Sequence, residues 1–230
     1  MADSKQTQAI VDTLKSKSAM KLDIFDASKA VFTVFKSELK SVADALKKGV
    51  GDSKDQINIE YIERGEFEAE LRFAGDILIF YMHTNTFKFN KEHQVSKLAY
   101  VKEDEKRKYC SMISIYNFLA DSFKYNRTND LGYLIARIFV NLEKHFFVEG
   151  KGQLGFLYTG FGEGTIDNKV MRSIIERAIL DTLDFDLLTP PYEEVKEVTV
   201  DAMKEASHYM KMKTGKRMGF SFKSDDNQPQ

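Results

Sequence analysis

Cysteine, proline and tryptophan are scarce in this sequence of 230 residues. It has one cysteine, Cys110, three prolines and no tryptophan. A single cysteine excludes an internal disulfide and a cysteine-based zinc site. The few prolines, together with 30% charged residues, exclude collagen-like and proline-rich low-complexity chains. No stretch reaches the roughly 18 uncharged apolar residues that a membrane-spanning helix needs, so we expect no membrane association.

An excess of either charge is also missing. The chain has 34 lysines and arginines against 35 aspartates and glutamates. This balance removes the broad attraction to polyanions on which non-specific nucleic-acid binding depends, so we expect none. The first 18 residues are polar and lack the apolar core of a secretion signal. We therefore expect a cytoplasmic protein.

Apolar residues are abundant and strongly patterned. They make up 43% of the chain, which is enough for a folded core. Five of them in the N-terminal part recur at helical spacing: Val31, Phe35, Leu39, Val42 and Leu46. The spacing predicts a helical pair over 1–50, with a short helix over 4–18 and a longer one over about 26–48.

From residue 57 the period of the pattern falls to two. Phe67, Leu71 and Phe73 alternate with charged residues, which is typical of a half-buried strand. Further strands are predicted over 76–83, 86–90, 111–119, 121–126, 130–141, 144–150 and 152–161, and 91–108 is expected to be a loop or a short exposed helix. The connections are short, so the sheet over 57–161 should be antiparallel and meander-like, with six to nine strands.

The C-terminal third returns to a helical pattern. Two helices are predicted within 165–214, the first capped by Thr165 and the second beginning near Pro190. Residues 223–230 are expected to form a disordered tail. The predicted fold is one α+β domain over 1–222, a large antiparallel sheet flanked by N-terminal and C-terminal helices.

Several predicted strands are apolar on both faces, among them 76–82 and 131–140. One layer of helices cannot easily cover both faces of so large a sheet. Either helices flank both faces, or a second chain covers one of them. We therefore expect a homo-oligomer that associates through that face or through the terminal helices, or a contact with another protein.

The segment 150–165 is the most distinctive, because it holds six of the thirteen glycines. Gly150, Gly152 and Gly155 match a dinucleotide fingerprint formally, but the residues that follow suggest a strand instead of the required helix. Four residues remain as a candidate site for a small anionic ligand, since they lead toward a helix N-terminus: Gly160, Gly162, Gly164 and Thr165. The competing interpretation is a tight connection between a strand and a helix.

No catalytic or metal-binding pattern is present. The four histidines, His83, His93, His145 and His208, are not at ligand spacing, and no nucleophile motif occurs. We expect no metal and no cofactor. This favours a non-catalytic interaction or ligand-sensing module that forms homo-oligomers. The alternative is an enzyme or sensor that binds a phosphorylated small molecule at the glycine-rich turn 160–165.

A third hypothesis concerns a short stretch in which aromatic and basic residues alternate. Lys124, Tyr125 and Arg127 combine groups that stack on bases with groups that attract phosphates. The stretch predicts either a specific nucleic-acid site or an ordinary hairpin loop.

Overall fold

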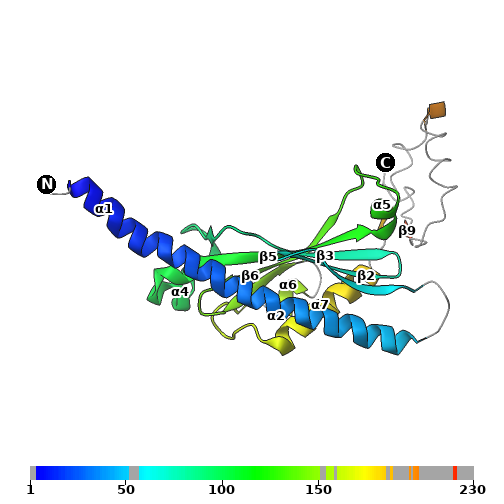
Figure 1. Ribbon diagram of the computed structural model, residues 1–230, viewed down its shortest axis with the longest axis horizontal. Helices are drawn as coiled ribbons and strands as arrows, with labels where there is room; N and C mark the ends of the chain where they lie inside the picture. The colour runs from blue at the N-terminus through cyan, green and yellow to red at the C-terminus, as the bar shows by residue number, and fades with distance from the viewer. Residues whose placement is uncertain are drawn as a thin grey trace, which may run out of the picture.

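The computed structural model describes residues 4–51, 57–150, 154–157, 160–184, 187–188, 197, 199–201 and 220–221. In these residues an antiparallel sheet of seven strands is flanked by a long N-terminal helix and a C-terminal helix (Figure 1). The predicted α+β class and antiparallel sheet are therefore confirmed. None of the described helices is both long enough and apolar enough to cross a lipid bilayer.

The N-terminal residues form one continuous helix. It consists of α1 (Lys5–Thr13), a π-helical turn (η1, Leu14–Ser18) and α2 (Ala19–Val50). The predicted pair of separate helices over 1–50 is wrong, because no glycine or proline lies between residues 5 and 48 to end the first one. The helix ends at Gly51, whose positive φ of 58° lets its N–H reach the carbonyl of Lys47.

The sheet has the order β1-β2-β3-β5-β6-β7, and β4 also pairs with β5. Every pairing within it is antiparallel. The strands are β1 (Ile59–Glu63), β2 (Glu68–Phe73), β3 (Asp76–Met82), β4 (Phe87–Lys88), β5 (Tyr109–Leu119), β6 (Tyr133–Asn141) and β7 (Phe146–Gly150). Between β4 and β5 lie three short helical segments: α3 (Gln94–Lys97), α4 (Ala99–Glu103) and η2 (Glu105–Lys108).

Two predicted strands are helical turns instead. The segment 121–126 belongs mostly to α5 (Ala120–Lys124), and 152–161 contains α6 (Leu154–Leu157). The second error has a visible cause: Gly155 packs so closely on β7 that an added Cβ would lie 2.4 Å from the carbonyl oxygen of Gly150. The chain turns back at this point and does not extend the sheet.

The C-terminal helix α7 (Asn168–Leu183) begins later than predicted. Its N-cap is Asp167, whose Oδ1 accepts the N–H of Val170 at 2.8 Å. Thr165 is not the cap, because it forms an isolated β-bridge with His145. A parallel pair, β8 (Leu187–Leu188) with β9 (Phe220–Ser221), is also described. Most of the second predicted C-terminal helix and all of the predicted tail 223–230 lie outside the described residues.

The helices α2 and α7 cover one face of the sheet, which we call the inner face. The main core lies between them, and Phe35 of α2 packs on Phe80 of β3 with ring centroids 5.6 Å apart. The alternation along each strand decides which residues enter this core, since it sends Leu71, Leu78 and Ile113 to the same side.

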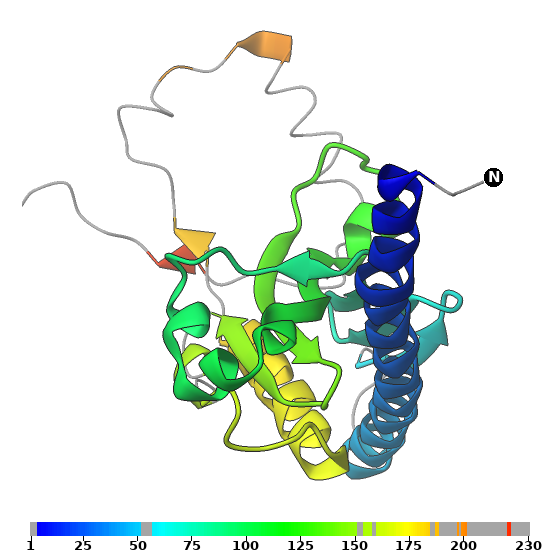
Figure 2. The ribbon, with the colours of Figure 1, turned by 90° about the vertical axis from the view of Figure 1, so that its left-hand side faces the viewer.

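The opposite, outer face is covered at one end by the segment between β4 and β5. Val95 of α3 and Val101 of α4 pack there on Cys110, Phe139 and Phe161. Figure 2 shows α2 and α4 on different sides of the strands. Each face of the sheet therefore has its own apolar core, and the main one is on the inner face.

The inner core should be very sensitive to the loss of Phe35, which is fully buried. Phe35→Ala is expected to lower the free energy of unfolding by about 3–5 kcal/mol, since it removes a buried ring and leaves a cavity. The neighbouring Val34 is 38% exposed, so Val34→Ala should change it by less than about 1 kcal/mol. Urea denaturation followed by circular dichroism measures both; equal losses would contradict the described packing.

Candidate interaction surface

The N-terminal part of the long helix projects beyond the sheet (Figure 1). No residue of α1 is buried. Three large apolar side chains in this projecting part are more than half exposed: Ile10 at 60%, Leu14 at 56% and Leu22 at 64%. The first buried side chain of the helix is Ile24, so the helix extends several turns past the region where the sheet can cover it.

The π-helical turn aligns the two exposed leucines. In a regular α-helix, residues eight apart lie about 80° apart around the axis. One extra residue in the turn Leu14–Ser18 returns Leu14 and Leu22 to within about 20° of each other. The turn therefore produces one apolar stripe on the projecting helix, and π-bulges are frequent at functional sites.

A groove runs beside this stripe. It has a volume of about 680 Å³ and is lined by Ser18, Lys21, Leu22, Phe25, Thr84, Asn85 and Thr86. One of the lining residues, Phe25, packs its ring on Phe67, with 5.9 Å between the ring centroids. The hydroxyl of Thr86 donates to the carbonyl of Lys21 at 3.4 Å, which ties the far wall to the helix. The lining combines the apolar Leu22 and Phe25 with polar residues, and such a combination suits an amphipathic helix.

The uncovered part of the outer face exposes less apolar surface than the projecting helix does, and its buried charge is hydrogen-bonded. Tyr81 is a large apolar residue exposed there, at 37%, while Ile79 and Tyr116 beside it are half-buried. Glu70, only 1% exposed, accepts hydrogen bonds from Arg64 and Arg72 at 2.8 to 3.2 Å. Two guanidinium groups on one carboxylate compensate its burial.

The glycine-rich turn lies next to the outer core and not at a helix start. Gly160 accepts the N–H of Glu163 in a tight turn, and the Glu163 carboxylate lies over Gly160. The first N–H groups of α7 are capped by Asp167. Gly162 has a φ of 100° and packs against the ring of Tyr100. The anion site at Gly160, Gly162, Gly164 and Thr165 stays a prediction, and this geometry adds no support to it.

Tyr100 is the centre of a polar network that sequence patterns did not reveal. Its hydroxyl donates to Glu143 at 2.7 Å and accepts from the side-chain amide of Asn141 at 2.8 Å. The guanidinium of Arg107 lies 4.3 Å over its ring and donates to Glu143. Burial, more than the neighbouring carboxylate, raises the pKa of Tyr100 to about 12. The network fastens α4 to the end of β6.

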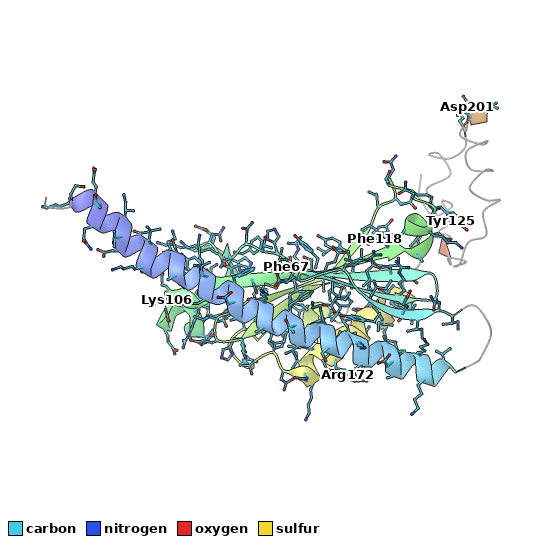
Figure 3. The ribbon with its side chains drawn as sticks, in the orientation of Figure 1. Phe67, Lys106, Phe118, Tyr125, Arg172 and Asp201 are labelled. Carbon is cyan, nitrogen blue, oxygen red and sulfur yellow. The ribbon has the colours of Figure 1, made fainter. Side chains whose placement is uncertain are left out.

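The residues of the nucleic-acid hypothesis lie at the end of the sheet away from α1. Figure 3 shows Phe118 and Tyr125 together there, beside α5. The ammonium of Lys124 lies 5.2 Å over the ring of Tyr125, and Arg127 forms an ion pair with Asp130 at 2.9 Å. These contacts within the chain engage the groups that would bind a base or a phosphate, and the hypothesis stays a prediction.

The residues that could bind a metal ion or react as a thiol in the described part of the chain are its histidines, acidic residues and cysteine. No group of three or more histidine, cysteine or acidic residues is placed there to hold a metal ion. Cys110 is fully buried, and burial raises the pKa of its thiol far above the usual value. Neither the stripe nor its groove was predicted from the sequence. The signals that could have revealed them are the absence of helix breakers and the leucines at 14 and 22.

Two glycines in the turn should respond differently to alanine. Gly162→Ala is expected to lower the free energy of unfolding by about 1–3 kcal/mol, because its φ is positive and the new Cβ would lie 2.6 Å from the Tyr100 ring. Gly164→Ala meets nothing within 4 Å and should change it by less than about 0.5 kcal/mol. Thermal and urea unfolding measure the difference; equal values would refute the structural role of Gly162.

Tyr100→Phe should lower the free energy of unfolding by about 1–2 kcal/mol near neutral pH, since the Asn141 amide loses its acceptor. The raised pKa means that folding favours the neutral phenol. The stabilisation that the neutral phenol of Tyr100 provides is complete below pH 10 and is lost as the pH rises toward about 12. Urea unfolding of both proteins across this range should therefore show the wild type losing more stability than the variant. A constant difference would contradict the assignment.

Comparison of the chain with protein-family models, with curated proteins and with solved structures finds no match in any of the three.

Proposed function

We propose that this protein is a non-catalytic interaction module that self-associates through its projecting N-terminal helix and the groove beside it. The observation that carries the proposal is the exposure of Ile10, Leu14 and Leu22 on a helix that extends past its own sheet. We define the association surface as the stripe of these three residues together with the groove lined by Phe25 and Thr84–Thr86.

The free energy of helix formation supports a partner. None of the nine residues of α1 is buried, so within this chain only its continuity with η1 and α2 supports the helix there. Burying one leucine side chain contributes about 1.5–3 kcal/mol. Covering the stripe would therefore stabilise both the helix and the complex.

The charges near the stripe favour a protein partner over a lipid surface. Residues 5–26 contain four lysines and three aspartates, which nearly cancel. Helices that bind anionic membranes usually carry a strong excess of basic residues on their polar face.

A cytoplasmic location is part of the proposal, and it is consistent with a single, buried, unpaired cysteine at position 110.

Placing a charge in the stripe should abolish self-association. Wild-type protein is expected to sediment as an oligomer at micromolar concentration, and Leu14→Glu or Leu22→Glu should sediment as monomers, since a carboxylate cannot be buried there without a partner. Leu180→Glu is the matched control, because Leu180 is an exposed helical leucine outside the surface, and it should leave the oligomer unchanged. Analytical ultracentrifugation measures the mass, and circular dichroism checks the fold. A monomeric wild type would end the proposal.

A further inference from the structure

Two histidines in the connection from β3 to β5 accept hydrogen bonds from the backbone. Nδ1 of His83 accepts the N–H of Asn85 at 3.0 Å, and Nδ1 of His93 accepts the N–H of Val95 at 3.2 Å. A backbone N–H can only donate, so each ring must have a free lone pair on Nδ1 and carry its hydrogen on Nε2. Protonation of either ring would place a hydrogen on Nδ1 and remove the acceptor.

His145 makes the opposite kind of bond. Its Nδ1 lies 3.0 Å from the carbonyl oxygen of Gly164, which can only accept. That bond needs a hydrogen on Nδ1, and a protonated ring has one as well. The bonds of His83 and His93, in contrast, exist only while the rings are neutral.

The turn that begins at His83 forms one wall of the groove in the association surface. Thr84–Thr86 line the groove, and they lie within this turn or directly after it. The Thr86 hydroxyl donates to the carbonyl of Lys21 and so joins the turn to α2. The bond between His83 and Asn85 therefore shapes a wall of the groove. His93 is not among the residues that line it.

The ring of His83 is held in place by its neighbours on the sheet. It lies edge-on to Phe87, with 4.8 Å between ring centroids, and to Tyr81, with 6.2 Å. Its backbone N–H donates to the carbonyl of Met112 on β5 at 2.8 Å. The half-buried ring thus holds the Asn85 N–H from a fixed position, so loss of this bond would release the turn and leave the strand in place.

We propose that His83 makes self-association dependent on pH, because the groove keeps its shape only while this ring is neutral. The inference rests on the proposed function and adds its regulation. A histidine ring gains its proton within the range of pH 5–8. The Asn85 N–H would then face a second donor, and the turn must open to separate the two. The wall formed by Thr84–Thr86 moves with the turn, so association should be strong above this pH range and weak below it.

The titratable and charged groups on the elements around His83 do not replace the lost bond. They are Tyr81 of β3, Glu68 of β2, Arg137 of β6, Lys88 of β4 and Lys21 of α2. None of the ion pairs among the described residues includes His83. A protonated His83 therefore loses its backbone partner and gains no carboxylate in exchange.

Sedimentation of the full-length protein at about pH 7.5 and about pH 5.5 tests the inference. The wild type should associate about three- to tenfold more weakly at the lower pH, since a hydrogen bond between backbone and side chain is lost. His83→Asn should associate equally at both, because the asparagine oxygen accepts a backbone N–H two residues on and does not titrate. His93→Asn is the matched control: it removes the same charge and the same kind of bond outside the groove, and it should keep the pH dependence of the wild type.

A second measurement does not depend on association. In the Leu14→Glu variant, nuclear magnetic resonance should show the Asn85 amide signal shifting in step with the titration of the His83 ring. A signal that stays constant while the ring titrates would overturn the inference. An oligomer that responds to pH identically in the wild type and in His83→Asn would overturn it as well, while keeping self-association. A wild type that is monomeric at both pH values would overturn the proposed function itself.

Discussion

The packing of α2 on the inner face of the sheet is the contact on which the rest of the molecule depends. Phe32, Phe35 and Leu39 are fully buried there, between the strands and α7. The two elements differ in length, however. The 32 residues of α2 span about 48 Å, while strands of six to eleven residues span roughly 20–36 Å. With α1 added at the same end, the helix must extend past the sheet, and its apolar residues there have no cover from the strands.

The outer face shows how a sheet that is apolar on both sides can be covered without a second long helix. At one end, α3 and α4 cover Phe139 and Phe161. The close approach depends on Gly162, because a side chain at that position would collide with Tyr100. Farther along the face, Glu70 is buried but hydrogen-bonded by two arginines, so the surface there is partly polar. The glycine-rich segment, the most distinctive feature of the sequence, thus has a packing role that its spacing alone did not indicate.

The periodic parts of the sequence were predictable, and the contacts between distant segments were not. The alternation at Phe67, Leu71 and Phe73 predicted β2, and the stripe through Phe35 and Leu39 predicted most of α2. The predictions failed where packing between segments decides the local conformation. Thr165 does not cap α7, because it pairs with His145 in another part of the chain, and Asp167 is the N-cap instead. That partner is too far away in sequence to leave a periodic pattern. The close approach of Gly155 to Gly150 is local, but it is a single contact and produces no period either.

The sequence by itself determined the class of fold, because the 3.6-residue and two-residue periods dictate which side chains a helix or strand can bury. Only the tertiary structure decided which apolar residues stay uncovered. Val31 and Leu14 look alike in the pattern of the helix, but the sheet reaches the first and ends before the second. Burial depends on the element that lies opposite, and that element is placed by strand pairing between residues far apart in the chain.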